Sequence, residues 1–168
     1  MTTAADLMTK AVITCSPTAS IREAARLMYL NGLSGLPVLS SDGTLVGFVS
    51  ELDLIRTEER IHAPVNFSLL GTLLYFDNPL NGDEIEKQIK ILTAMTVERL
   101  MSKPAITISS DAPIENIVEL FIHKHKKTVP VVDGGKLVGI ISRADVVKLL
   151  AGERELTQNP WRNLMQKQ

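Results

Sequence analysis

An internal repeat constrains this sequence most strongly, because two copies of one unit must fold alike. Sliding the chain against itself by 93 residues aligns the first copy with the second, and the offset becomes 92 after one residue is dropped in a turn. The matched positions span the whole unit, so the repeat covers entire structural elements. They include Leu7/Leu100, Met8/Met101, Ile13/Ile106, Pro37/Pro130, Gly47/Gly139, Ser50/Ser142 and Asp53/Asp145.

Each copy reads as β-α-β-β-α. A short extended piece precedes a helix with apolar residues at helical spacing, which Asn31-Gly32 should end. Two strands joined by a glycine turn form a hairpin, and a second helix follows. Because the helices cover one face of each small sheet, the other faces are expected to pack against each other, sheet to sheet. The expected fold class is therefore α+β.

The repeat divides the chain into four expected segments. Residues 1–56 form the first repeat, 57–95 an ordered connecting insert, 96–152 the second repeat and 153–168 a C-terminal tail. The insert has an apolar stretch at 65–76 and an amphipathic helix pattern after Asp83. The apolar stretch is read as core or cover, with an oligomer interface or a lid near a ligand cleft as the open alternative.

Composition excludes several classes of protein. The net charge of −1 disfavours a broadly basic nucleic-acid binder, and 4% aromatic residues disfavour a base-stacking platform. No apolar run approaches the ~20 residues of a membrane span, and no signal peptide is visible. A single cysteine, Cys15, indicates a reducing compartment, so a cytoplasmic protein without nucleic-acid or membrane partners is expected.

Two S-x-x-D motifs occupy equivalent positions, each after a strand and at the start of a helix. These are Ser50 with Asp53 and Ser142 with Asp145. One interpretation is a helix cap, in which serine and aspartate satisfy the free backbone N–H groups. The other adds a ligand, because a helix N-terminus suits a phosphate and a carboxylate accepts the hydroxyls of a ribose.

In these motifs and in its strand sequences, the repeat resembles the cystathionine-β-synthase (CBS) domain. The resemblance rests on Gly35-Leu36-Pro37-Val38, Leu45-Val46-Gly47 and the S-x-x-D motif, and on their counterparts in the second copy. It implies a stand-alone tandem pair, a Bateman module, whose repeats pack sheet to sheet about a pseudo-two-fold axis. Such modules bind adenosine-containing ligands in two clefts between the repeats and usually form homodimers.

The resemblance also implies which residues line the two clefts. Backbone groups of 12–14 and 105–107 would read the edge of the adenine. The first cleft would use Ser142, Arg143 and Asp145 with Val12, Ile13, Thr14, Leu33, Ser34 and Pro37. The second would use Ser50 and Asp53 with Ala105, Ile106, Thr107, Lys126, Lys127 and Pro130.

The two clefts differ in charge. Arg143 could pair with a phosphate in the first, whereas the equivalent Glu51 would repel one in the second. The basic run at 123–127 lies near the second cleft and is either a solvated helix end or a phosphate clamp. The second copy also lacks the helix-ending Gly32 of the first.

The expected function is a regulatory module that senses AMP, ADP, ATP or an adenosyl compound such as S-adenosylmethionine and acts on a partner protein. The nucleotide would be an effector, and no cofactor is required. Histidine spacing and the lack of a cysteine cluster predict no metal site, and no activated nucleophile predicts an enzyme. The alternative is a nucleotide-independent interaction or dimerisation module, in which the S-x-x-D motifs only cap helices.

Overall fold

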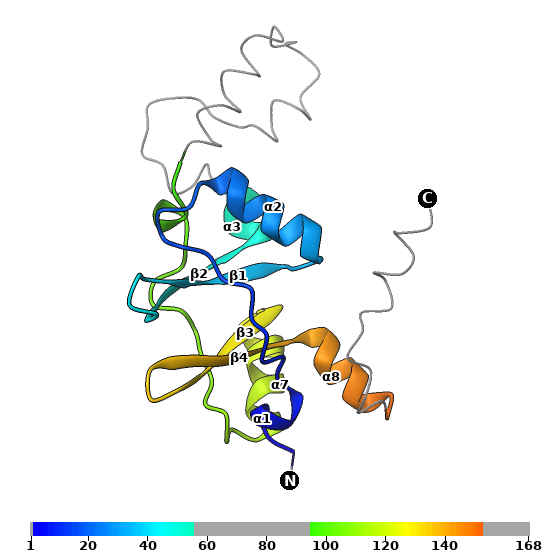
Figure 1. Cartoon of the computed structure of the whole chain (residues 1–168). Helices are drawn as coiled ribbons and strands as arrows, with labels where there is room; N and C mark the ends of the chain where they lie inside the picture. The colour runs from blue at the N-terminus through cyan, green and yellow to red at the C-terminus, as the bar shows by residue number, and fades with distance from the viewer. Residues whose placement is uncertain (1, 56–94, 153–168) are drawn as a thin grey trace, which may run out of the picture.

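The computed structural model describes residues 2–55 and 95–152, and its centre is two β-hairpins stacked between outer helices (Figure 1). β1 (Gly35–Leu39) pairs antiparallel with β2 (Leu45–Ser50), and β3 (Thr128–Asp133) pairs antiparallel with β4 (Lys136–Ser142). The registers are equivalent, since Pro37 lies opposite Phe48 and Pro130 opposite Ile140. The two hairpins predicted from the repeat are confirmed.

Four helices follow the predicted order. α2 (Ile21–Asn31) and α3 (Glu51–Ile55) belong to the first copy, and α7 (Ile114–His123) and α8 (Arg143–Leu150) to the second. The side chain of Ser20 caps α2 by accepting a 3.2 Å bond from the backbone N–H of Glu23. Gly32 ends α2 in the left-handed region at φ 61°, as its sequence predicted.

Two short elements were not predicted, and each packs against the other repeat. α1 (Ala4–Leu7) lies against α8 and β4, while the 3-10 helix η1 (Val97–Arg99) lies against the first copy. Thr9 and Ile140 exchange backbone hydrogen bonds of 2.9 and 3.0 Å, and Ser102 and Phe48 do the same at 2.8 and 3.1 Å. Residues 3–9 and 95–102 thus complete the hairpin of the opposite copy.

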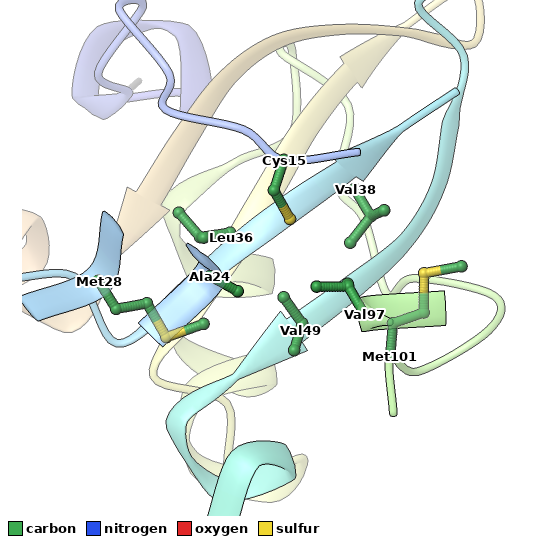
Figure 2. Packing of buried hydrophobic residues seen from close by; sticks show 8 residues of the cluster. All are labelled: Cys15, Ala24, Met28, Leu36, Val38, Val49, Val97 and Met101. Carbon is green, nitrogen blue, oxygen red and sulfur yellow. The ribbon is translucent and has the colours of Figure 1, made fainter. Parts of the chain in front are cut away.

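The first core shows how these parts pack (Figure 2). Its sheet side chains are Leu36, Val38 and Val49, which meet α2, Cys15 and the exchanged segment. Leu36 and Val38 point toward α2, so Pro37 between them points to the opposite face of the sheet. Pro37 is nevertheless fully buried. Pro130 is buried in the same way, which confirms that the two sheets cover each other. The first cluster comprises Cys15, Ala24, Met28, Leu36, Val38, Val49, Val97 and Met101.

The extended pieces before each first helix join the sheets in parallel. Cys15 bridges Val38, and Ile108 bridges Val131. The segments 12–14 and 105–107 directly precede these bridging residues. The interpretations of the insert and of the tail fall on residues 56–94 and 153–168, outside the described part of the chain.

Candidate functional site

Both S-x-x-D motifs form helix caps. The backbone N–H and the Oγ of Ser142 donate to Asp145 Oδ2 at 2.6 and 2.7 Å. Ser50 makes the same two bonds to Asp53 Oδ2 at 2.9 and 2.7 Å, and Asp53 N–H donates back to Ser50 Oγ at 3.3 Å. The capping interpretation is confirmed. The same bonds hold each carboxylate in a fixed place at the start of a helix.

A cavity of about 200 Å³ adjoins the cap formed by Ser50 and Asp53, and we call it the Ser50 cavity. Its walls come from both repeats: the end of β2 and the start of α3 on one side, and the segments 102–106 and 125–128 on the other. The lining residues are Ser34, Phe48, Ser50, Glu51, Leu52, Asp53, Ser102, Pro104, Ile106, His125, Lys126, Lys127 and Thr128.

The structure brings together part of the residue set predicted for the second cleft. Ser50, Asp53, Ile106, Lys126 and Lys127 all line the Ser50 cavity. The remaining three predicted residues are not among its lining: Ala105 and Thr107 flank Ile106, and Pro130 is buried within β3.

Five lining residues were not predicted. Phe48, Leu52 and Pro104 add apolar surface, and Ser102 and Thr128 add hydroxyl groups. The exchange of segments explains why Ser102 and Pro104 were missed, since they reach β2 only because 95–102 crosses to the other copy. The side chain of Leu52 is 50% exposed and that of Ile106 40% exposed, so the cavity offers open apolar surface.

Opposite charges meet at the cavity across the two repeats. Lys127 Nζ lies 3.3 Å from Glu51 Oε2, and both side chains are largely exposed. Beside them, the hydroxyls of Ser34 and Thr128 share a 2.9 Å hydrogen bond. Glu51 was expected to repel a phosphate, but in this structure it neutralises the lysine that would bind one. Ser34 was predicted for the first cleft, and it lines the Ser50 cavity.

Arg143 holds the end of α7. Its Nε donates to the carbonyl of Lys126 at 2.9 Å, and its Nη2 donates to the carbonyl of Phe121 at 3.1 Å. These carbonyls lie at and beyond the helix end, where a cation interacts favourably with the helix dipole. In this arrangement the guanidinium positions the 125–127 segment, a role that the phosphate interpretation did not include.

The other residues predicted for the first cleft are partly or fully buried. Val12, Ile13, Leu33, Ser142 and Asp145 are half-buried, and Pro37 is fully buried. Their shared role in binding a ligand stays a prediction.

A second cavity of about 370 Å³ lies beside α2. It is lined by Thr14, Cys15, Glu23 and neighbouring residues, so Thr14 borders this space. Burial, together with the nearby Glu23 carboxylate, raises the pKa of the Cys15 thiol to about 11. The thiol is therefore neutral near pH 7, which does not suit a nucleophile.

Across residues 2–55 and 95–152, no three histidine, cysteine or acidic side chains gather into a group that could hold a metal ion. In the same part of the chain, none of the helices has the length and apolar character needed to span a membrane.

Comparison with known proteins identifies the repeat. A family model described as CBS domain matches residues 4–60 and 97–152. The chain belongs to the CBS-domain family. Uncharacterized protein MJ1426 of Methanocaldococcus jannaschii is 31% identical over 150 residues, which cover 86% of this chain and 89% of that protein. The two CBS domains form the tandem pair that the sequence predicted.

Solved structures of CBS pairs share the fold. CBSX2 of Arabidopsis thaliana, whose crystal structure was solved in complex with AMP, is 26% identical in sequence to this chain. The two structures superpose with a TM-score of 0.66, over 90% of this chain and 98% of that one. The CBS domain pair of MJ0100, in complex with 5′-methylthioadenosine and S-adenosyl-L-methionine, is 24% identical with a TM-score of 0.64, over 91% and 98%. At 24% identity, the similarity to MJ0100 shows only that the two proteins share a fold. This chain spans 60% of the length of chloroplastic CBSX2.

Proposed function

We propose that this CBS pair is a regulatory module that binds an adenosine-containing nucleotide in the Ser50 cavity. Ligand occupancy would change the conformation or the oligomer geometry that a partner protein senses. One observation carries the proposal: a cavity between the repeats combines a fixed carboxylate, open apolar surface and two lysines. The AMP-bound structure of the related CBSX2 supports the choice of ligand class.

Each part of such a ligand finds suitable chemistry in the cavity. Leu52 and Ile106 offer apolar surface to a base. Asp53 lies at the start of α3, where its carboxylate can accept the hydroxyls of a ribose. The cavity is smaller than the about 300–1,000 Å³ of typical ligand pockets, so a phosphate would extend to the rim, near Lys126 and Lys127.

The proposed ligand is an effector, and the proposed role is binding without catalysis. A ligand can shift the module between two shapes only by its differential affinity for them. A cavity built from both repeats meets this requirement, since a change in their relative position alters its walls. The proposed setting is the cytoplasm, where a lone buried thiol such as Cys15 stays reduced.

A matched pair of variants tests the site. Ser50→Ala and Asp53→Ala both break the hydrogen bond between the two side chains that cap α3, but only Asp53→Ala removes the carboxylate. AMP at 100 times its dissociation constant should add ~2.7 kcal/mol of stability, or about 5–10 °C in the melting temperature of the parent. We expect Ser50→Ala to keep most of this shift and Asp53→Ala to lose it.

The ligand and the alternative site supply the controls. We expect 2′-deoxy-AMP to bind the parent more weakly than AMP, and the difference to vanish in Asp53→Ala. Asp145→Ala removes the equivalent carboxylate of the first cleft. AMP binding that survives Asp53→Ala but not Asp145→Ala would place the ligand in the first cleft. No response to AMP, ADP, ATP or S-adenosylmethionine at millimolar concentration would favour the nucleotide-independent interaction module.

The proposal includes a homodimer and a regulated partner protein that the chain itself does not identify. Large apolar side chains are exposed on the outer helices at positions that the repeat makes equivalent, Tyr29 with Ile122 and Ile55 with Val147. Exposed apolar faces of this kind commonly mark interaction surfaces, and a two-fold axis pairs each face with a second copy.

Light scattering tests the homodimer. The parent should show twice the chain mass at micromolar concentration, and Ile55→Glu and Val147→Glu should lower it toward the monomer. Lys136→Glu, at an exposed position of β4 away from the outer helices, should not. A parent that is monomeric at every concentration would reject the homodimer and leave the nucleotide proposal in place.

A further inference from the structure

His125 has an unusual backbone conformation. Its φ is 51°, and among the residues that the structure describes it is the one non-glycine residue with a positive φ. The 93-residue offset places it at the position of Gly32, whose φ is 61°. Both copies therefore need the left-handed conformation after their first helix. Glycine adopts it without cost, whereas a side chain there meets the following carbonyl.

Packing does not account for histidine at this position. The residue is exposed, and within the described part of the chain no hydrogen bond or ion pair holds its imidazole. Asparagine and histidine tolerate the conformation better than most residues, but glycine, as in the first copy, would remove the strain altogether. A strained residue that the fold itself does not require points to a function.

The surroundings of His125 indicate what that function is. His125 lines the Ser50 cavity beside Lys126 and Lys127, so three side chains with N–H donors stand together at one end. Arg143 fixes this segment through its 2.9 Å bond to the carbonyl of Lys126. The backbone that carries these three N–H donors is therefore fixed in position by Arg143. Such an arrangement suits an anionic group, because charge-assisted hydrogen bonds to phosphate oxygens are strong.

We propose that His125 is a specificity-determining residue of the Ser50 cavity, where its imidazole donates a hydrogen bond to the phosphate of the bound ligand. The inference rests on the proposed function, since it names the part of the nucleotide that this residue recognises. It explains why the second copy keeps a side chain where the first has Gly32. The contact also distinguishes nucleotides from nucleosides, which present no phosphate to the rim.

The experiment compares AMP with adenosine, which lacks the phosphate. His125→Gly removes the imidazole and relieves the backbone, and His125→Asn removes the imidazole in a residue that accepts the same conformation. His123→Asn is the matched control, because His123 is exposed at the end of α7 and does not line the cavity. Dissociation constants come from calorimetry, and melting temperatures are measured without ligand.

We expect both His125 variants to bind AMP about tenfold more weakly and adenosine as the parent does. His123→Asn should change neither. Without ligand, His125→Gly should melt about 1–2 °C higher than the parent, so stability and AMP affinity change in opposite directions. A purely structural histidine would show the gain in stability and no loss of affinity.

Two results would overturn the inference while leaving the proposed function intact. One is AMP binding by His125→Gly and His125→Asn at the parent's affinity. The other is an equal loss for AMP and adenosine, which would mean that the imidazole does not contact the phosphate. A parent that binds neither compound would instead reject the proposed function, and the inference with it.

Discussion

Gly32 and His125 occupy equivalent positions of the two repeats, and both adopt a positive φ. Substitutions at the two positions therefore measure the free-energy cost of a side chain in this conformation. Gly32 lies at φ 61° at the end of α2. We expect Gly32→Ala to lower the free energy of unfolding by about 1 kcal/mol, because an L side chain is strained there by ~1–2 kcal/mol and alanine restricts the unfolded chain. Urea denaturation followed by circular dichroism measures the change.

An exposed residue of the same helix serves as the control for Gly32. Arg26→Ala keeps a helical conformation and should stay within about 0.5 kcal/mol of the parent. If Gly32→Ala were as stable as Arg26→Ala, the left-handed cap would not be a requirement of this fold, and the explanation of His125 would lose its reference point.

Cys15 gives a second prediction at the residue scale. Burial and then Glu23 raise the pKa of its thiol from 9.0 to about 11, so the folded protein holds the thiol neutral where an unfolded chain would ionise it. Stability from this group is complete below pH 9 and is lost as the pH rises toward 11. We expect iodoacetamide to alkylate folded Cys15 much more slowly than the urea-unfolded chain at pH 8.5.

Variants that remove a carboxylate test whether Glu23 contributes to the raised pKa of Cys15. Glu23→Gln removes the carboxylate that opposes ionisation, so the alkylation profile should move to lower pH. Glu119→Gln, an exposed acid on α7, should leave the profile in place. Equal alkylation rates in the folded and unfolded parent would contradict a thiol protected by burial.

At the scale of elements, the exchanged segments depend on two glycines. A Cβ on Gly47 would lie 2.6 Å from Met101 Sδ and 3.0 Å from the carbonyl oxygen of Ser102, and Gly139 stands in the same relation to Met8. We therefore expect Gly47→Ala to cost about 1–3 kcal/mol, since the exchanged segment must move away from β2. Chemical denaturation gives the value.

A double-mutant cycle isolates the contact between Gly47 and Met101. Met101→Ala empties the space that the new Cβ needs, so the two changes together should cost less than their sum. Additive losses would mean that the sulfur of Met101 is not what excludes the methyl group. A Gly47→Ala protein as stable as the parent would contradict the close approach itself.

The same elements show what the sequence could and could not reveal. Helical spacing, the glycine turns and the S-x-x-D caps are local patterns, and they predicted the hairpins, the four main helices and the position of Asp53. The exchange of residues 3–9 and 95–102 depends on contacts with strands far along the chain, such as Thr9 with Ile140. Local patterns contain no such information, so Ser102 and Pro104 were missed as cavity residues.

At the scale of the whole molecule, the ion pair between Glu51 and Lys127 joins the two repeats at the Ser50 cavity. Exposed pairs of this kind contribute about 0–1 kcal/mol, so a phosphate competes for the lysine easily. Binding would then release Glu51 and change a contact between the repeats. Glu51→Gln removes the competitor and leaves Lys127 available, so we expect AMP to bind about threefold more tightly.

Glu98 and Lys103 provide the matched control for this last prediction. They form a similar exposed pair at 3.0 Å, and neither of the two residues lines the cavity. Glu98→Gln makes the same change in net charge and should leave AMP affinity unchanged. The gain from Glu51→Gln should also shrink at 1 M salt, where charges are screened within about 3 Å. Equal effects of the two variants would mean that net charge matters, and that the pair across the repeats does not respond to the ligand.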